Sequence, residues 1–412
     1  MKRWLSVFLT TAMVVALFVG IGGTALASET KTLNLWHWDP AQSNAISKII
    51  ADYEAEHPDV KVEMSVIDFA NYRTKLKTSI PAGTGPDIIV TGSFAAYEMI
   101  PAGLFMDLTE RIAASDIDLT KMPKATLDIY TIDGHIYGIP KDYDTIGLYY
   151  NKEMFDAAGL AYPDESWTWQ DLREAAKKLT IPGKQWGYIS TPYSQTGIEN
   201  NIFQNNGRVV DESRLKSVIN SPENIETLQF FLDFITVDHS SPTGQELLEM
   251  PADQMFMAEQ AAMMVGGSWA VAPVRDVLGT KFDVTHLPKG KRQATIIHGL
   301  AFAGSSKTKY PEETWNFLRM CATEKAQAYQ YDCTIPGYEG SAQKWVENFP
   351  DHNVQVFIDM ASYAVGDYIP VHNPGGATDA FEQEFNRIWL GEKTVEQGLA
   401  DAEAAMNEAM SQ

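Results

Sequence analysis

Two spacings of apolar side chains alternate along the first hundred residues. Apolar positions at every second residue, or in a short run, predict strands, and apolar positions three and four residues apart predict helices. The predicted strands lie at 32–36, 60–66 and 86–90, and the predicted helices at 45–56 and 72–80. Strands separated by helices of this length form parallel βαβ units. The sequence therefore predicts a parallel sheet with a ligand site beyond the carboxyl ends of its strands.

The pattern changes between residues 130 and 151. Asp133-Gly134, which lies between two tyrosines, predicts a hairpin turn, and a long strand is predicted at 146–150. We interpret this stretch as the first passage of the chain between two lobes. The second passage is expected near 282–287, because 298–303 again has the pattern of a short buried strand.

Beyond the first passage the pattern is mostly helical. Thr168 and Ser221 each precede an apolar stripe at helical spacing and are predicted N-caps, and a further helix is predicted at 311–331. A continuous helix would hold Cys321 and Cys333 about 18 Å apart, beyond disulfide reach. Pairing of the two cysteines therefore requires a break between them, and the sequence leaves that question open.

The first residues have the pattern of an export signal. Lys2 and Arg3 precede an apolar run at 7–21, and the small-residue motif Ala25-Leu26-Ala27 follows. This pattern predicts a signal peptide over 1–27. A membrane span is the alternative, but it requires roughly 20 apolar residues. Bacterial lipoproteins carry a cysteine where this chain has Ser28, so we expect an exported protein without a lipid anchor.

Charge narrows the choice of partner. The chain of 412 residues has a formal net charge of −22, which becomes −24 without Lys2 and Arg3. Such a surface repels phosphate backbones, which argues against nucleic acid as a partner and favours a neutral or cationic ligand only weakly. The length is sufficient for two domains with a core each.

Aromatic and polar side chains occur together at the predicted end of the first strand. Trp36, His37, Trp38 and Asp39 supply ring faces and hydroxyl partners within four positions. Strand alternation places Trp36 and Trp38 on one face and His37 on the other. A tryptophan at this position is alternatively a core residue. No second His or Cys lies at a short spacing from His37, so we expect neither a metal site nor a cofactor.

A second group of candidates lies in the later part of the chain. Two glycines before Ser268 bring the backbone close to an occupant of a cleft, and Trp269 follows in a position to stack on it. The alternative is a tight turn with Trp269 packed inward. Gly267 is therefore a candidate too. Weaker candidates are Ser93, Phe94, His298, Gly299, Tyr331 and Tyr368.

Several stretches, taken in order, resemble one family. They are 85–88, 103–108, 138–155, 158–160, 167–172 and 263–269. In this combination the chain resembles the bacterial extracellular solute-binding proteins of sugar ABC importers, the maltodextrin-binding-like group. The resemblance implies an α/β, two-lobed periplasmic-binding-protein-like fold of type II. Each lobe is then a mixed sheet flanked by helices, and hinge strands join the lobes, which close on the ligand.

The resemblance also implies a division of the chain and a function. The first lobe would comprise 28–143 and 286–334, and the second 144–285 and 335–412. A sugar would bind between them and pass to the membrane permease subunits of the importer. We expect a periplasmic monomer and no catalysis.

Three site residues come with the resembling stretches: Asp87, Asp142 and Tyr143. Asp142 would accept a sugar hydroxyl and Tyr143 would stack, because the family often places such a pair near the hinge. The alternative is a turn whose aspartates face water.

Two other functions remain alternatives. A secreted glycoside hydrolase needs two carboxyl groups roughly 5–10 Å apart, and no motif in the chain fixes such a pair. A polyamine or peptide would also bind aromatic and acidic side chains. Salt-dependent affinity would distinguish a polyamine from a neutral sugar.

Overall fold

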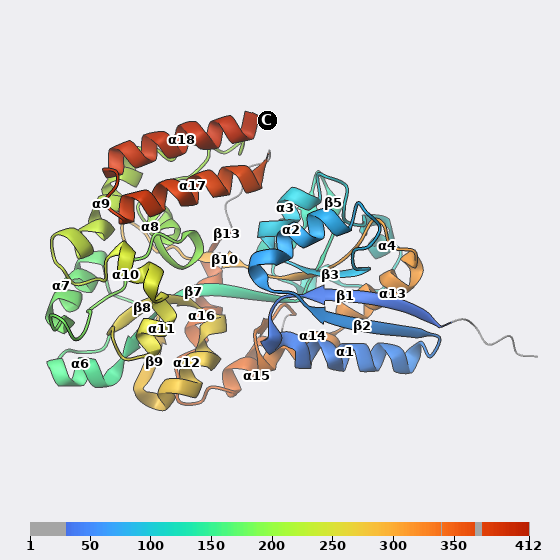
Figure 1. The fold of residues 1–412 in the computed structure, drawn as a ribbon. Coiled ribbons are helices and arrows are strands. Elements are labelled where there is room, and N and C mark those ends of the chain that lie inside the picture. Colours follow the sequence, from blue (N-terminus) through green and yellow to red (C-terminus); the bar gives the residue numbers. More distant parts are fainter. Residues whose placement is uncertain (1–29, 339, 367–372, 412) are drawn as a thin grey trace, which may run out of the picture.

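The computed structural model describes residues 30–338, 340–366 and 373–411, and it arranges them as two lobes. Figure 1 shows the lobe that contains β1 to β3 on the right and the lobe that contains α6 to α12 on the left. The predicted signal peptide and Tyr368 lie outside the described residues. No helix in the described ranges combines the length and the apolar character needed to cross a membrane.

The first lobe is built on a five-stranded sheet. In spatial order its strands are β2 (Val60–Val66), β1 (Lys31–His37), β3 (Ile88–Thr91), β11 (Ala301–Gly304) and β6 (Ile139–Pro140). The first three are parallel, and β11 is antiparallel to β3 and β6. The parallel βαβ arrangement predicted for the start of the chain is therefore confirmed. Fully buried side chains such as Leu33 and Leu35 anchor the sheet in the core of this lobe.

Short helices and a hairpin cover this sheet. They are α1 (Ser43–Glu56), α2 (Phe69–Ser79), α3 (Ser93–Met99), α4 (Thr109–Ala113), α5 (Lys124–Ile129), β4 (Thr131–Ile132), β5 (His135–Ile136), α13 (Pro311–Cys321) and α14 (Glu324–Ala328). Asp133 and Gly134 both have positive φ, 52° and 81°, as a two-residue hairpin turn requires. The predicted hairpin is thus present.

The helix predicted at 311–331 is interrupted. It ends at Cys321 and restarts at Glu324, because Thr323 adopts an extended conformation and its side chain accepts a hydrogen bond from the amide of Ala326. Despite this break, Cys321 and Cys333 are both free.

The second sheet is organised around β7 (Asp142–Asn151), which is buried along its whole length. The other strands are β8 (Met263–Gly267), β9 (Phe282–Thr285), β10 (Ile296–His298), β12 (Ile335–Pro336) and β13 (Val365–Gly366). β12, β10, β8 and β9 pair with β7 in antiparallel orientation, and β13 is parallel to β10. Figure 1 shows β7 running from the middle of the molecule into the left lobe.

Helices surround the second sheet. They are α6 (Lys152–Ala158), α7 (Trp169–Leu179), α8 (Glu199–Gln204), α9 (Pro222–Thr236), α10 (Gly244–Glu249), α11 (Ala252–Met257), α12 (Val271–Leu278), α15 (Ala342–Glu347), α16 (Gln355–Asp359), α17 (Pro374–Trp389) and α18 (Val395–Ser411). The predicted caps are confirmed: Thr168 forms a capping box with Asp171, and the side chain of Ser221 accepts from the amide of Asn224.

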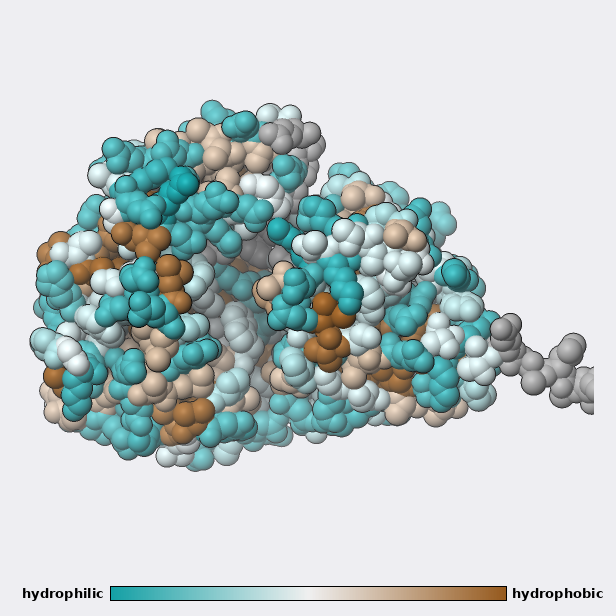
Figure 2. All heavy atoms as spheres, in the orientation of Figure 1, coloured by the Kyte–Doolittle hydropathy of each residue, from teal (hydrophilic) through white to brown (hydrophobic). Residues whose placement is uncertain are grey.

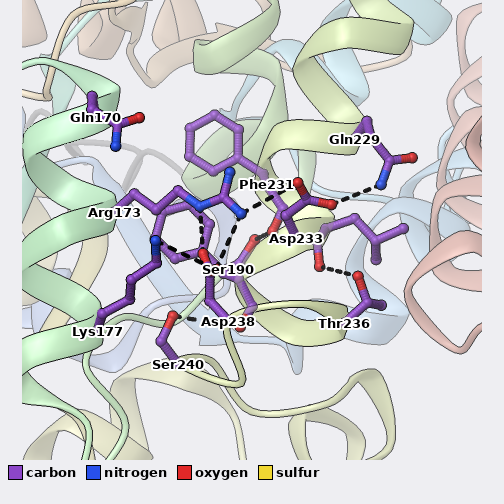
Figure 3. Close-up of polar contacts among 12 residues, drawn as sticks. Gln170, Arg173, Lys177, Ser190, Gln229, Phe231, Asp233, Thr236, Asp238 and Ser240 are labelled. Atoms are coloured by element: carbon purple, nitrogen blue, oxygen red, sulfur yellow. Dashed lines mark hydrogen bonds and ion pairs between the residues drawn. The ribbon is translucent and has the colours of Figure 1, made fainter.

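An arginine ties α7 to α9 in this lobe. Arg173 forms an ion pair with Asp238 and donates a hydrogen bond of 3.4 Å to Asp233, and Lys177 lies 3.6 Å from Asp238 (Figure 3). The guanidinium also lies 5.4 Å from the ring centroid of Phe230. These contacts fix the outer helices of the lobe.

The second passage between the sheets lies later than predicted. β9 pairs with β7 inside the second sheet, so the expectation of a crossing at 282–287 is wrong. The segment 298–303 is two strands instead of one, because β10 ends in the second sheet and β11 begins in the first. The break falls at Gly299, where a Cβ would lie 2.3 Å from the carbonyl oxygen of Asp142. The predicted lobe boundary between 285 and 286 therefore falls before β10, and the predicted boundaries at 143 and 334 stay a prediction.

Three chain segments meet at this crossing. Lys141 and Asp142, both fully buried, form an ion pair. Asp142 Oδ1 accepts from the amide of Leu300 at 2.7 Å, and the amide of Lys141 donates to the carbonyl of Leu300 at 2.8 Å. The amide of Gly337 donates to the carbonyl of Lys141 at 3.0 Å. We call this set of contacts the hinge knot.

Candidate ligand-binding site

A cavity of about 270 Å³ lies between the two lobes, and side chains of both lobes line it. Figure 2 shows the surface hollowed between the lobes. The lining residues are Trp38, Asp39, Gln42, Phe69, Gly92, Ser93, Asp144, Gln195, Trp269, His298, Leu300 and Thr334. Trp38 and Gly92 directly follow the carboxyl ends of β1 and β3, so the cavity lies where the parallel strands predicted a ligand site.

The first lobe contributes an aromatic wall. The Trp38 ring lies 5.8 Å from that of Phe69 and 5.0 Å from that of Tyr72, measured between centroids. The strand ends before Asp39, which is the N-cap of a one-turn helix at Pro40–Gln42. Its Oδ1 accepts a hydrogen bond of 3.0 Å from the amide of Ala41. Phe69 is 56% exposed, so much of its side chain is open to a molecule in the cavity.

Only one tryptophan of the first strand reaches the cavity. Trp36 is not among the described residues that line it. Its ring lies 4.6 Å from the ammonium group of Lys75, and it packs against the core below α2 and α3. Lying on the same face of the strand as Trp38 therefore did not bring Trp36 into the cavity wall.

Trp269 forms the opposite wall. It follows β8 in a one-turn helix (Ser268–Ala270), and its ring meets the His298 ring edge-on at 5.2 Å between centroids. A Cβ at Gly267 would lie 1.8 Å from the indole ring, so only glycine allows the ring to fold back over the strand. Trp269 both lines the cavity and packs partly against the core of the second lobe. The ring therefore has the surroundings of both alternatives, and its role in ligand binding stays a prediction.

A buried carboxyl group lies in the cavity wall beside this ring. Ser268 Oγ donates a hydrogen bond to Asp144, and His298 Nε2 lies 3.9 Å from Asp144 Oδ2. Burial, with a smaller contribution from nearby Asp142, raises the pKa of Asp144 to about 7. The carboxyl group therefore keeps its proton to a higher pH than an exposed aspartate does, and in the protonated form it can donate as well as accept a hydrogen bond.

Two predicted residues lie inside the framework of the first lobe. His37 is buried at the end of β1, its Nε2 lies 3.5 Å from Ser43 Oγ, and burial lowers its pKa. Asp87 accepts from the amide of Asn34 at 2.8 Å and from Thr308 Oγ1 at 2.6 Å. Neither residue is among the described residues of the cavity wall.

The hinge candidates also lie away from the cavity. Asp142 is engaged in the hinge knot, and Tyr143, on the other face of β7 from Asp144, lines a separate hollow of about 380 Å³. Gly299 gives the close backbone approach at the crossing. Tyr331 lies in a one-turn helix (Tyr329–Asp332), where its carbonyl accepts from Asn348 Nδ2 at 2.9 Å.

The predictions and the cavity wall overlap in part. Trp38, Asp39, Ser93, Trp269 and His298 are brought together there. Phe94 lies in α3, and its side chain is outside the described part of the chain. Among the described residues, no three His, Cys, Asp or Glu side chains gather in a way that could hold a metal ion.

Sequence reasoning missed Gln42, Phe69, Gly92, Asp144, Gln195, Leu300 and Thr334. Phe69 gave no separate signal, because it precedes the buried residues Tyr72 and Leu76 by three and seven positions, which is the spacing of an ordinary core face of a helix. Gln42 and Gln195 lie in single helical turns that carry no periodicity, and only the fold brings them to the cavity.

Comparison with known proteins identifies relatives of this architecture. Residues 38–328 match the model of the family described as bacterial extracellular solute-binding protein. A galactooligosaccharide-binding protein from Bacillus subtilis is 26% identical over 99% of this chain and 96% of its own length. A maltotriose-binding protein from Pyrococcus abyssi is 25% identical over 70% of this chain, and the matched region spans 62% of that relative.

Solved structures agree with the fold. An ABC substrate-binding protein from Listeria monocytogenes, solved in complex with cycloalternan, is 27% identical and has a TM-score of 0.86, with 92% of this chain and 99% of that chain covered. The GacH receptor of Streptomyces glaucescens, at 19% identity and a TM-score of 0.81, shares the fold. The predicted two-lobed fold class is confirmed.

Proposed function

The chain belongs to the bacterial extracellular solute-binding proteins, and from that premise we propose that it is the sugar-binding component of an ABC importer. The observation that carries the proposal is the interlobe cavity. It has aromatic rings on both sides, Trp38 with Phe69 on one lobe and Trp269 on the other, with amide, carboxyl and imidazole groups between them.

This combination matches the chemistry of a sugar. Aromatic faces cover the apolar C–H faces of the ring, and polar side chains pair with hydroxyl groups that would otherwise be buried without partners. Relatives that are described as binding maltotriose or galactooligosaccharide support a saccharide ligand for this chain as well. In the proposed role, the protein acts outside the cytoplasmic membrane as a monomer and delivers the unchanged sugar to the permease subunits of the importer.

A thermal-shift screen tests the proposal. Maltotriose, galactotriose, lactose and mannobiose are compared with spermidine and a tripeptide. We expect at least one saccharide to raise the unfolding temperature, because a ligand at about 100 times its dissociation constant adds about 2.7 kcal/mol of stability. Chromatography of the recovered ligand should show it intact. Stabilisation by spermidine alone, or appearance of cleaved sugar in proportion to protein, would contradict the proposal.

A further inference from the structure

We propose that Arg73 and Glu98 of the first lobe form a charged clasp on α17 of the second lobe, and that salt weakens closure of the lobes by screening this clasp. The clasp joins the lobes without lining the described cavity wall. This inference goes beyond the proposed function, because it concerns the equilibrium between the lobes and applies to the ligand-free protein as well.

The clasp lies close to the interlobe cavity on the first lobe. Phe69 begins α2 and lines the cavity, and Arg73 follows it by one helical turn. Ser93 begins α3 and also lines the cavity, and Glu98 follows on the same helix. Figure 1 shows α17 extending from the left lobe towards α3 of the right lobe, and the two helices are in contact. Hinge bending that separates the cavity walls therefore also separates α17 from the clasp residues.

The clasp is a row of alternating charges across the boundary between the lobes. Lys77 and Glu98 form an ion pair within the first lobe. Arg73 Nε lies 3.9 Å from Glu98 Oε2, and Arg73 Nη2 lies 3.5 Å from Asp379 Oδ1 in α17. A single exposed ion pair contributes little, but several charges in one network contribute more. The side chain of Glu98 is 17% exposed, so water screens this member of the row less than the other three.

The amino end of α17 adds a second attraction. A Cβ at Gly375, in the first turn of α17, would lie 3.5 Å from Arg73 Nη1 and 3.5 Å from Glu98 Oε2. The backbone of this turn therefore lies against both charged side chains. The first turn of a helix carries a partial positive charge, which favours a nearby carboxylate. Glu98 thus meets the positive end of α17, while Arg73 meets the carboxylate of Asp379 one turn further along.

The clasp makes closure depend on ionic strength. Salt shortens the range of attraction between exposed charges from about 10 Å at 0.1 M to about 3 Å at 1 M. A neutral sugar has no charge that salt could screen. Because apparent affinity is proportional to the population of the binding-competent form, weaker closure at high salt lowers the affinity for a neutral sugar.

The test compares Arg73→Gln with Arg111→Gln. Arg111 is the matched control, because it pairs with Glu312 at 2.7 Å and both residues belong to the first lobe. The two arginine side chains are similarly exposed, 35% for Arg73 and 29% for Arg111. Titration calorimetry measures the affinity for whichever of maltotriose, galactotriose, lactose or mannobiose stabilises the wild type most, at about 20 mM and about 500 mM sodium chloride.

We expect Arg73→Gln to lower affinity about two- to fivefold at the lower salt concentration, and to remove the salt dependence. Arg111→Gln should match the wild type. Because Asp379 acts through Arg73, adding Asp379→Asn to Arg73→Gln should cause no further loss. Equal salt dependence in the wild type and Arg73→Gln, as a charged ligand would produce, would overturn the clasp.

Small-angle scattering of the ligand-free protein separates this inference from the proposed function. If the wild type binds none of the four sugars, the proposed function fails and scattering decides on the clasp. We then expect the radius of gyration of the wild type to rise with salt to the value of Arg73→Gln, which should not change. The same radius for both proteins at both salt concentrations would overturn the clasp.

Discussion

Asp144 is a carboxyl group that the fold holds in the wall between the lobes. It has a hydrogen bond from Ser268, and His298 Nε2 lies 3.9 Å from it. Asp142, Lys141 and Asp39 supply the charges around it. Because burial dominates, the fold favours the protonated form and raises the pKa from the ordinary value of 3.8 to about 7. Because Asp144 also lines the ligand cavity, the stability of the ligand-free protein and the charge of the cavity change over the same pH range, in which Asp144 loses its proton.

The pH dependence of stability follows from this shift. A carboxyl group whose pKa is higher in the folded than in the unfolded protein makes its full contribution to the free energy of unfolding below the unfolded-state pKa. This contribution is lost as pH rises from about 4 through about 7. Asp144→Asn no longer titrates. Between pH 5 and pH 8, wild type should therefore lose more ligand-free stability than Asp144→Asn, as measured by urea unfolding. Equal losses in the two proteins would show that Asp144 titrates normally.

Trp269 is the residue whose loss should affect binding most. Trp269→Ala removes a stacking face from the second lobe, at a cost of roughly 1–3 kcal/mol, or about 5- to 150-fold in affinity. Trp36→Ala is the control, because that ring lies under Lys75 and outside the described cavity wall. Calorimetric titration should show near-normal affinity for Trp36→Ala. Equal weakening by both changes would refute the assignment of the cavity.

The hinge knot acts at the scale of elements, since it ties the end of β6, the start of β7 and the segments before β11 and after β12. Lys141→Met leaves the Asp142 carboxylate buried without its ion pair, and breaking a buried pair costs about 3–5 kcal/mol. The control is Lys124→Met, because the ion pair of Lys124 with Asp128 is exposed and should contribute under about 1 kcal/mol. Urea unfolding of ligand-free protein measures both. Similar small losses would mean that the knot does not stabilise the crossing.

Local signals predicted much of the fold. The alternation of apolar residues at 60–66 and the helix caps at Thr168 and Ser221 depend on residues that are close in sequence. The sequence alone could therefore predict them. The spacing of apolar residues in a short strand does not show which strand it pairs with. For this reason β9 was wrongly predicted to pass between the lobes. Asp142 and Asp144 lie on one face of β7, and only the meeting of three distant segments decides that Asp142 is covered.

At the scale of the whole molecule, the lobes also touch through residues that are not in the described cavity wall. The guanidinium of Arg214 lies 5.3 Å from the ring centroid of Tyr97, and Arg73 Nη2 lies 3.5 Å from Asp379 Oδ1. Both contacts join α2 or α3 of the first lobe to the second lobe. The ion pair of Arg73 with Asp379 is 35% and 55% exposed and is therefore weak, so we expect a ligand that touches both walls to supply much of the closing energy.

Closure should therefore depend on the sugar. Small-angle scattering with saturating ligand is expected to give a smaller radius of gyration than ligand-free protein, because only the bound sugar contacts Trp38 and Trp269 together. Trp269→Ala at the same ligand concentration should shift less. An unchanged profile for the wild type would contradict hinge closure.

A crystal structure of the complex with the saccharide that stabilises the protein most will show whether a sugar binds intact between the lobes. We expect density for an uncleaved sugar between the rings of Trp38 and Trp269. Density elsewhere would contradict it, for example in the hollow of about 460 Å³ that α1, α13 and α14 line on the first lobe.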